Sequence, residues 1–119
     1  ISNILAEKEG CEAIVTGESV GQVASQTLTA MMSTDSVSRL PVLRPLVGMD
    51  KNEIVVFSRK IDTFDISIRP FEDCCTVFTP KHPRLHPKAD EIEKAELSLD
   101  SDALISRAVE GVKQELITF

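Results

Sequence analysis

The chain has no tryptophan and no tyrosine, and its aromatic content is only 4 % of 119 residues. A surface that binds nucleic acid by stacking bases on aromatic rings is therefore nearly excluded. Apolar runs are only a few residues long, so the sequence predicts no transmembrane helix. The first residues lack a basic stretch followed by an apolar one, so no signal peptide is visible. The absent initiator methionine suggests that the numbered chain is a piece of a longer one.

Cysteine is also scarce, with only Cys11, Cys74 and Cys75 in the chain. Three cysteines are too few for the disulfide framework of a small secreted domain, and adjacent cysteines rarely bridge each other. A reducing, cytoplasmic compartment is therefore expected.

The net charge of −6 argues against a general phosphate-backbone binder, although the middle third of the chain is slightly basic.

What is present is a composition of 42 % hydrophobic and 27 % charged residues, which is typical of one globular domain. Short apolar runs rich in β-branched residues predict buried strands at 13–16 and 40–43. Apolar spacing of three and four residues predicts the helices. They are expected over residues 1–9, from about 21 to 31, from 51 to 61 and from 103 to 116. The third helix is expected to have Asp50 as its N-cap, with a capping box to Glu53. The fourth is expected to have Asp100 or Ser101 as its N-cap.

The remaining segments are predicted to be irregular or extended. Residues 33–38 are predicted as a polar loop, 64–71 as an extended stretch, and 79–90, which contain three prolines, as an irregular arm. The resulting order of helix, strand, helix, strand, helix is typical of a doubly wound α/β domain, although two strands are too few to complete one.

The first candidate site is the segment 16–27, which follows a predicted strand and opens a predicted helix. Open α/β sheets bind ligands at such a place. Gly17 and Gly21 would let the backbone approach a ligand, and Ser25 and Gln26 could hydrogen-bond a nucleotide. The alternative interpretation is a plain strand-to-helix turn with small residues that pack the helix.

Arg44 follows the second predicted strand and forms the second candidate site. Its guanidinium could clamp a phosphate or a carboxylate with two hydrogen bonds. Alternatively, it is a surface arginine paired with one of the chain's many acidic residues.

The third candidate is the pair Cys74 and Cys75. A nucleophilic cysteine must be a thiolate, and the neighbouring Glu72 and Asp73 disfavour that form by raising the thiol pKa, although nearby basic residues could offset them. The alternative is two packed, small hydrophobic side chains.

The two adjacent cysteines, His82 and His86 are a candidate zinc site. Adjacent cysteines fit a tetrahedral site poorly, and each histidine precedes a proline, so the two do not share a helix face. No bound metal is predicted from these residues. The chain also lacks a Walker motif, an HExxH helix and a serine-protease order of residues.

Three motifs occur in an order and spacing that resemble a known family. They are TGESVGQVASQT at 16–27, LRPL at 43–46 followed by DKNEI at 50–54, and EDCC at 72–75. Together they resemble the tRNA 4-thiouridine synthetases, or thiamine-biosynthesis tRNA sulfurtransferases, over roughly residues 4–88. The resemblance implies that residues 1–90 are the C-terminal portion of a PP-loop ATPase domain and that 91–119 form a C-terminal acidic segment and helix. The implied fold is part of a doubly wound parallel sheet with helices on both faces.

The resemblance also implies an activity. Such enzymes adenylate O4 of a tRNA uridine with ATP and Mg²⁺ and then replace the activated oxygen with persulfide sulfur. A cysteine desulfurase donates the sulfur, and the same sulfur transfer serves the thiazole of thiamine. The implied partners are tRNA, the desulfurase, a sulfur-carrier protein and a second copy of the chain, with no membrane.

Site residues follow by position in the motifs. Gly17 and Gln26 match family positions that bind ATP, Cys74 matches the catalytic cysteine of sulfur relay, and Cys75 is a candidate second thiol. Five further residues are candidate contacts with ATP or its phosphates: Ser19, Gly21, Gln22, Ser25 and Arg44.

Some features of the family are missing from these residues. The PP-loop signature Ser-Gly-Gly-x-Asp-Ser, the RNA-binding module and a rhodanese-like extension do not occur. The isolated chain is therefore expected to have negligible adenylation activity, because the phosphate cradle is absent. Asp62 stands where relatives usually place glycine. The alternative function is a non-catalytic nucleotide-binding or assembly module in which both cysteines of the EDCC motif are structural.

Overall fold

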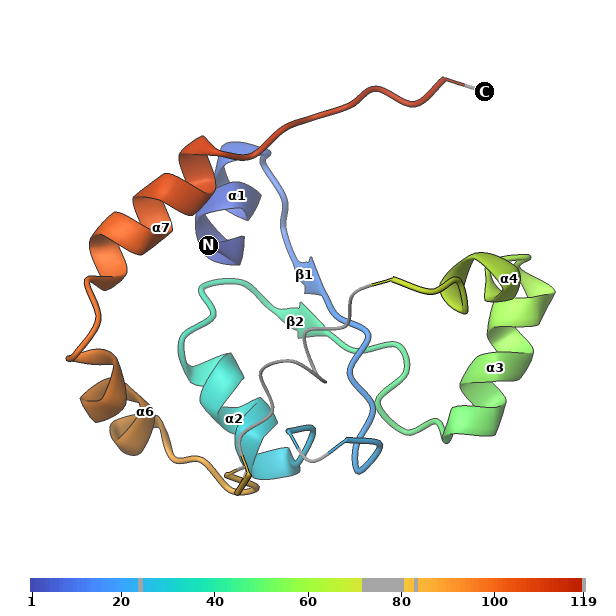
Figure 1. Cartoon of the computed structure of the whole chain (residues 1–119), viewed down its shortest axis with the longest axis horizontal. Coiled ribbons are helices and arrows are strands. Elements are labelled where there is room, and N and C mark those ends of the chain that lie inside the picture. The colour runs from blue at the N-terminus through green and yellow to red at the C-terminus, as the bar shows by residue number, and fades with distance from the viewer. Residues whose placement is uncertain (24, 72–80, 83, 119) are drawn as a thin grey trace.

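A computed structural model of the chain describes residues 1–23, 25–71, 81–82 and 84–118 (Figure 1). The helices are α1 (Ser2–Lys8), α2 (Leu28–Ser36), α3 (Lys51–Lys60), α4 (Phe64–Ser67), α6 (Ala89–Glu96) and α7 (Ser101–Glu110), and the strands are β1 (Ile14–Val15) and β2 (Val42–Leu43). This is an α/β arrangement, as the sequence predicts. Among the described helices, none has the length and apolar character needed to cross a lipid bilayer.

The two strands form a parallel pair in which Ile14 faces Val42 and Val15 faces Leu43. The ladder extends past the strands, because the amide of Thr16 donates to the carbonyl of Leu43 at 3.0 Å. In a parallel pair, the carboxyl ends of both strands lie at the same edge. The segments that follow β1 and β2 are therefore neighbours in space although they are distant in sequence.

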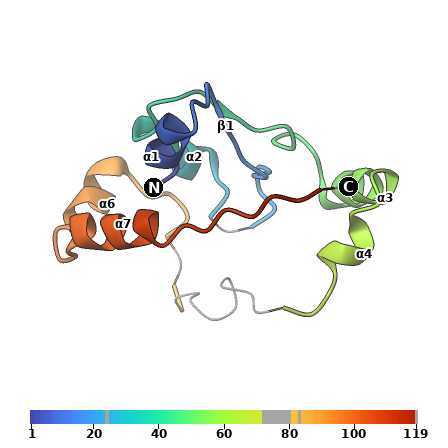
Figure 2. The ribbon, with the colours of Figure 1, turned by 90° about the horizontal axis from the view of Figure 1, so that it is seen from above.

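The helices surround this small sheet unevenly. Figures 1 and 2 show α6 and α7 on one side of the strands, while α3 and α4 project from the opposite side. The segment before α6 lies along α2, because Thr27 donates its hydroxyl proton to the carbonyl of Leu85 at 2.7 Å and Ser33 to that of Pro87 at 2.9 Å.

Two predicted helix starts are confirmed by their caps. The Asp50 carboxylate accepts hydrogen bonds from the amides of Asn52 and Glu53, and the Glu53 carboxylate accepts one from the Asp50 amide at 2.8 Å, which completes the capping box. Asp100 caps α7 by accepting from the amide of Ala103 at 3.2 Å. The helix ends at Glu110, however, and not at residue 116.

The predicted start of α2 is wrong. The helix begins at Leu28, because Thr27 adopts an extended conformation and its hydroxyl accepts a hydrogen bond from the Ala30 amide. Gly21 has φ of 77°, which a right-handed helix cannot include. The helix also continues through residues predicted to be a loop, since the hydroxyls of Ser33 and Thr34 donate to carbonyls four residues earlier and so remain satisfied.

Two other segments differ from expectation. Residues 64–67, predicted to be extended, form the short helix α4, which packs on α3 through the Arg59 guanidinium 3.8 Å above the Phe64 ring. The prediction of an irregular arm over 79–90 agrees with the described residues only as far as Lys88, because α6 begins at Ala89. Asp90 and Glu91 in the first turn of α6 favour a helix there, because carboxylates stabilise helix N-termini.

Little of the chain is buried. In the described part of the chain the buried side chains are Ala6, Met31 and Ser19, at 8 %, 5 % and 2 % exposure. The radius of gyration is 16.5 Å, whereas a compact domain of this length has one of about 13.5 Å. With so small a core, contacts between polar groups have a large share in positioning the loops.

Asp62 occupies the position at which the resemblance places glycine, and its backbone explains that preference. Its φ is 55°, in the left-handed region. The Thr63 amide donates to the Ser58 carbonyl at 2.9 Å and the Asp62 amide to the Arg59 carbonyl at 3.2 Å, which is the Schellman pattern that ends many helices. Aspartate tolerates this conformation better than most residues but less well than glycine.

Replacing Asp62 with glycine should therefore stabilise the chain. We expect Asp62→Gly to raise the free energy of unfolding by about 0.5–1 kcal/mol, because it removes the strain of a Cβ in the left-handed region. Urea unfolding followed by circular dichroism measures this change. Asp65→Gly is the matched control, since Asp65 is in a right-handed helical turn, and it should destabilise the chain by about 0.3 kcal/mol. Equal effects at both positions would contradict the role of the positive φ.

Candidate functional site

The residues predicted to bind a nucleotide lie in two segments that contact each other. We call them the 17–27 loop, which follows β1, and the 44–49 turn, which follows β2. The amide of Val20 donates to the carbonyl of Val47 at 3.1 Å, and the hydroxyl of Ser19 donates to the carbonyl of Met49 at 2.6 Å. The parallel pairing of the strands brings the loop and the turn to one edge of the sheet.

The 17–27 loop is closed by Gln26. The side-chain oxygen Oε1 of Gln26 accepts a hydrogen bond from the Ser19 amide at 3.1 Å, and its backbone carbonyl accepts one from the Gly21 amide at 2.9 Å. The left-handed conformation of Gly21 turns the chain so that both contacts form. Gln26, predicted as an ATP-binding residue, is thus also a structural part of the loop.

The loop buries one of its predicted site residues and exposes others. Ser19 is only 2 % exposed, so its hydroxyl contacts the interior of the protein. Gln26 is half-buried, and four candidates face solvent: Gly17, Gly21, Gln22 and Ser25. A Cβ added at either glycine would meet no atom within 4 Å, so the space beside both glycines is open to a ligand.

Arg44 forms a half-buried ion-pair cluster with Glu18 and Asp35. Its Nε donates to Glu18 at 2.7 Å, while its two terminal nitrogens donate to the two oxygens of Asp35 at 2.7 and 3.2 Å. The Arg44 side chain is only 10 % exposed. Of the two interpretations from sequence, the structure shows the pairing with acidic residues, although it is a half-buried cluster and not a surface pair. A phosphate contact by Arg44 would require these bonds to rearrange and stays a prediction.

The cluster keeps the arginine charged. The hydrogen bond to Asp35 raises the pKa of Arg44, burial opposes this increase, and Glu18 contributes a further increase. A group whose pKa is higher in the folded than in the unfolded state contributes its full stabilisation at every pH below the unfolded pKa, and this contribution is lost only above that pH. The contribution of Arg44 to the free energy of unfolding is therefore independent of pH across the physiological range.

The cysteine motif is not part of this description, because Cys74 and Cys75 lie outside the described residues, and their roles stay predictions. His82 and His86 are both exposed. In the ranges that the structure describes, no three His, Cys, Asp or Glu side chains are grouped so that they could hold a metal ion.

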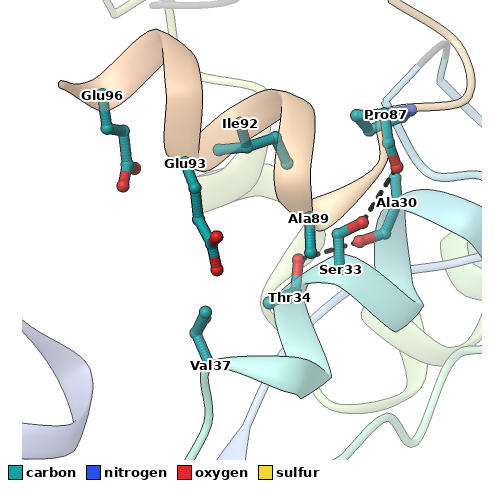
Figure 3. Close-up of a pocket in the computed structure, with 9 residues that line it drawn as sticks. All are labelled: Ala30, Ser33, Thr34, Val37, Pro87, Ala89, Ile92, Glu93 and Glu96. Carbon is teal, nitrogen blue, oxygen red and sulfur yellow. Dashed lines mark hydrogen bonds between the residues drawn. The ribbon is translucent and has the colours of Figure 1, made fainter. Parts of the chain in front are cut away.

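A hollow lies between α2 and α6, away from the predicted site residues (Figure 3). Its volume is about 300 Å³, and its lining residues are Ala30, Ser33, Thr34, Val37, Pro87, Ala89, Ile92, Glu93 and Glu96. The hydroxyls of Ser33 and Thr34 already donate to backbone carbonyls. The two glutamates at its wall repel phosphates, so this hollow suits a nucleotide less well than the 17–27 loop does. It contains none of the site residues predicted from the sequence.

Sequence reasoning missed Glu18, Asp35 and Met49, which hold the site together. Glu18 and Asp35 are two of 19 acidic residues, and spacing alone gives no reason to select them. Met49 contributes a backbone carbonyl, which no side-chain pattern reveals. The available signal was the position of Glu18 three residues after β1, at the edge where Arg44 follows β2.

Comparisons with known proteins converge on one family. The sequence pattern of the family described as thiamine biosynthesis protein (ThiI) matches residues 1–101. The chain is 53 % identical over 118 residues to a probable tRNA sulfurtransferase of Acetivibrio thermocellus, covering 99 % of this chain and 30 % of that protein. It is 52 % identical over 113 residues to a probable tRNA sulfurtransferase of Listeria innocua, covering 95 % of this chain and 28 % of that protein.

A solved structure is similar over nearly the whole chain. It is a 4-thiouridine synthetase in complex with RNA and with bound ATP, with a TM-score of 0.87 and 43 % identity. The match covers 97 % of this chain and 30 % of that one. The chain thus spans less than a third of the length of these relatives.

Removing the Arg44 guanidinium should destabilise the chain more than removing a surface one. We expect Arg44→Met to lower the free energy of unfolding by about 1–2 kcal/mol, since it leaves the Glu18 carboxylate without its cationic partner while the more exposed Asp35 is solvated. Arg39→Met is the matched control, because the Arg39–Glu7 pair is 67 % and 51 % exposed. It should cost less than about 0.5 kcal/mol. Urea unfolding of both variants measures the difference, and equal losses would contradict the structural role of the cluster.

Proposed function

The chain belongs to the family described as thiamine biosynthesis protein (ThiI), and we propose that it supplies one wall of the ATP site and the sulfur-relay cysteine of a tRNA sulfurtransferase. The main support is the likeness to an ATP-bound 4-thiouridine synthetase over 97 % of the chain. The closed 17–27 loop supports the same proposal, because it presents Gly17 and Gln26 beside open space at the edge of the sheet. Open α/β sheets bind nucleotides at this edge.

In the proposed reaction ATP is a substrate that activates a tRNA uridine. O4 of the uridine attacks the α-phosphorus of ATP, so an O4–P bond forms while the bond to pyrophosphate breaks and pyrophosphate leaves. The terminal sulfur of a Cys74 persulfide then bonds to C4 while the C4–O4 bond breaks and AMP leaves. A second thiol attacks the Cys74 sulfur and breaks the S–S bond, which leaves the sulfur on C4 as 4-thiouridine and Cys74 in a disulfide. Gly17 and Gln26 contribute to holding the nucleotide, and Cys74 transfers sulfur that a cysteine desulfurase provides. Cys75 is the candidate second thiol. The same transfer would provide sulfur for the thiazole of thiamine.

The fold and partners extend this proposal. We infer that β1 and β2 belong to a doubly wound PP-loop sheet, which is consistent with the exposed Val15 on β1, at 66 %, and with the large radius of gyration. The partners are tRNA, the desulfurase, a sulfur-carrier protein and a second copy, in the cytoplasm. Mg²⁺ would accompany ATP.

The role of Cys74 can be tested in a chimera. In this chimera, the chain replaces the matching 118 residues of the Acetivibrio thermocellus relative. We expect Cys74→Ser to abolish 4-thiouridine formation, measured on tRNA by mass spectrometry, because serine cannot carry a persulfide. ATP binding, measured by calorimetry, should be unchanged.

Cys11→Ser is the matched control, since Cys11 is an exposed cysteine outside the motif. It should leave thiolation within twofold of the unsubstituted chimera. Full activity of Cys74→Ser would instead favour the alternative function, a nucleotide-binding or assembly module with structural cysteines.

The chain alone should form no detectable 4-thiouridine. A PP-loop signature does not occur in its sequence, so the phosphate charge that develops in the adenylation transition state lacks its stabilising donors. The measurement compares the chain with the chimera under identical ATP, tRNA and sulfur-donor concentrations. Thiolation by the chain alone at a rate near that of the chimera would overturn this expectation.

A further inference from the structure

We propose that Ser19 is a positioning residue for nucleotide binding, because it fixes the side-chain amide of Gln26 so that its N–H groups face the ligand. This inference rests on the proposed function, in which Gln26 contributes to the ATP site. It assigns to the buried Ser19 a role that acts through Gln26 and not by direct contact.

The orientation of the Gln26 amide follows from its partner. A backbone N–H can only donate, so the atom of Gln26 that lies 3.1 Å from the Ser19 amide must be the acceptor Oε1 and not Nε2. Nε2, with its two N–H donors, therefore points away from Ser19. Within the described ranges no protein group accepts from Nε2, and no buried side-chain polar atom there lacks a partner, so Nε2 is accessible and its donors are available to a ligand.

Ser19 is itself held firmly. Its side chain is 2 % exposed, and its hydroxyl donates to the Met49 carbonyl at 2.6 Å. The next residue, Val20, donates its amide proton to the Val47 carbonyl at 3.1 Å. These two bonds hold the Ser19 side chain and the peptide group that follows it against the 44–49 turn, which restricts movement of the Ser19 N–H away from Gln26.

The backbone of Gln26 is fixed from both directions as well. Its amide donates to the Val23 carbonyl at 3.0 Å, and its carbonyl accepts from the Gly21 amide at 2.9 Å. With backbone and side chain both held, Gln26 is ordered before a ligand arrives. Preorganisation of this kind strengthens binding by lowering the entropy lost in the complex.

The ligand group that such a side chain recognises must be a hydrogen-bond acceptor. ATP offers this chemistry in its phosphate oxygens and in its nucleoside, which carries the unprotonated ring nitrogens of adenine and the ribose oxygens. Competition experiments distinguish the two parts, because tripolyphosphate carries only phosphate oxygens and adenosine carries only the nucleoside acceptors. The part that Gln26 contacts is the one whose inhibition constant changes when the donors are removed.

The test uses Gln26→Glu in the chimera described above. Glutamate has nearly the same shape and still accepts from the Ser19 amide, but an ionised carboxylate cannot donate. We expect KM for ATP to rise at least tenfold at pH 7.5, with kcat within threefold and the melting temperature unchanged. Lowering the pH towards 5 should partly restore KM relative to the unsubstituted chimera, because a protonated carboxyl group carries one donor and glutamate titrates near about pH 4.3.

Asn52→Asp is the matched control. It makes the same change from amide to carboxylate at an exposed position in the first turn of α3, outside the 17–27 loop. KM for ATP should stay within twofold, and no recovery at low pH should appear. If Asn52→Asp raised KM as much as Gln26→Glu, added negative charge alone would explain the effect and the inference would fail.

A double-mutant cycle separates positioning from mere stability. Ser19→Ala keeps the amide but removes the bond to Met49, and we expect it to raise KM for ATP at least threefold. In the Gln26→Glu background the same substitution should change KM by less than 1.5-fold, because the donors are already absent. An equal change in both backgrounds would show that Ser19 does not act through Gln26.

The outcomes also separate this inference from the proposed function. An unsubstituted chimera that binds ATP and thiolates tRNA, with no change of KM in Gln26→Glu, overturns only the inference. A folded chimera that binds no ATP overturns the proposed function and, with it, the ligand assigned here.

Amide hydrogen exchange in the chain provides a second measurement, since Gln26→Ala should accelerate exchange at Ser19 and Gln26→Glu should not. Fast exchange at Ser19 in the unsubstituted chain would contradict the geometry directly.

Discussion

The guanidinium of Arg44 joins three segments that the sequence separates: the end of β2, the start of the 17–27 loop, and the second half of α2. Glu18 accepts its Nε proton, and Asp35 accepts from both terminal nitrogens. In a chain with so few buried side chains, this half-buried cluster replaces part of what a hydrophobic core normally does. The 17–27 loop can contact the 44–49 turn through Ser19 because Arg44 and Glu18 already hold the two segments together.

The same arrangement explains how a small sheet can present a ligand site. Two strands of two residues each give little surface, but their parallel pairing brings both following segments to one edge. The loop then uses backbone groups and one side-chain amide to order itself, while its glycines leave space open beside it. Family membership and the likeness to an ATP-bound synthetase agree with a nucleotide at this edge.

Local signals in the sequence predicted local structure well. The Asp50–Glu53 capping box and the Asp100 cap are complete within four residues, so their letters suffice. The start of α2 could not be predicted in this way, because residues 20–26 have helical spacing and only contacts with the 44–49 turn and within the loop override it. For Arg44 the sequence indicated an acidic or phosphate partner, but the choice of Glu18 and Asp35 depends on tertiary geometry. Helix α6 was not predicted, because the prolines before Ala89 indicate an irregular segment and the helix-forming residues begin only after them.

The register between β1 and β2 has a consequence for how the chain tolerates insertions and deletions. Ile14 faces Val42, and side chains alternate between the two faces of a strand. Removing one residue from β2 would turn Arg44 to the opposite face and separate it from Glu18, although every motif remained in the sequence. Adding residues between α2 and β2, at the exposed Val37 or Arg39, would leave the register unchanged. Length variation among related chains should therefore concentrate in that crossover, while the spacing from Val42 to Met49 should stay constant.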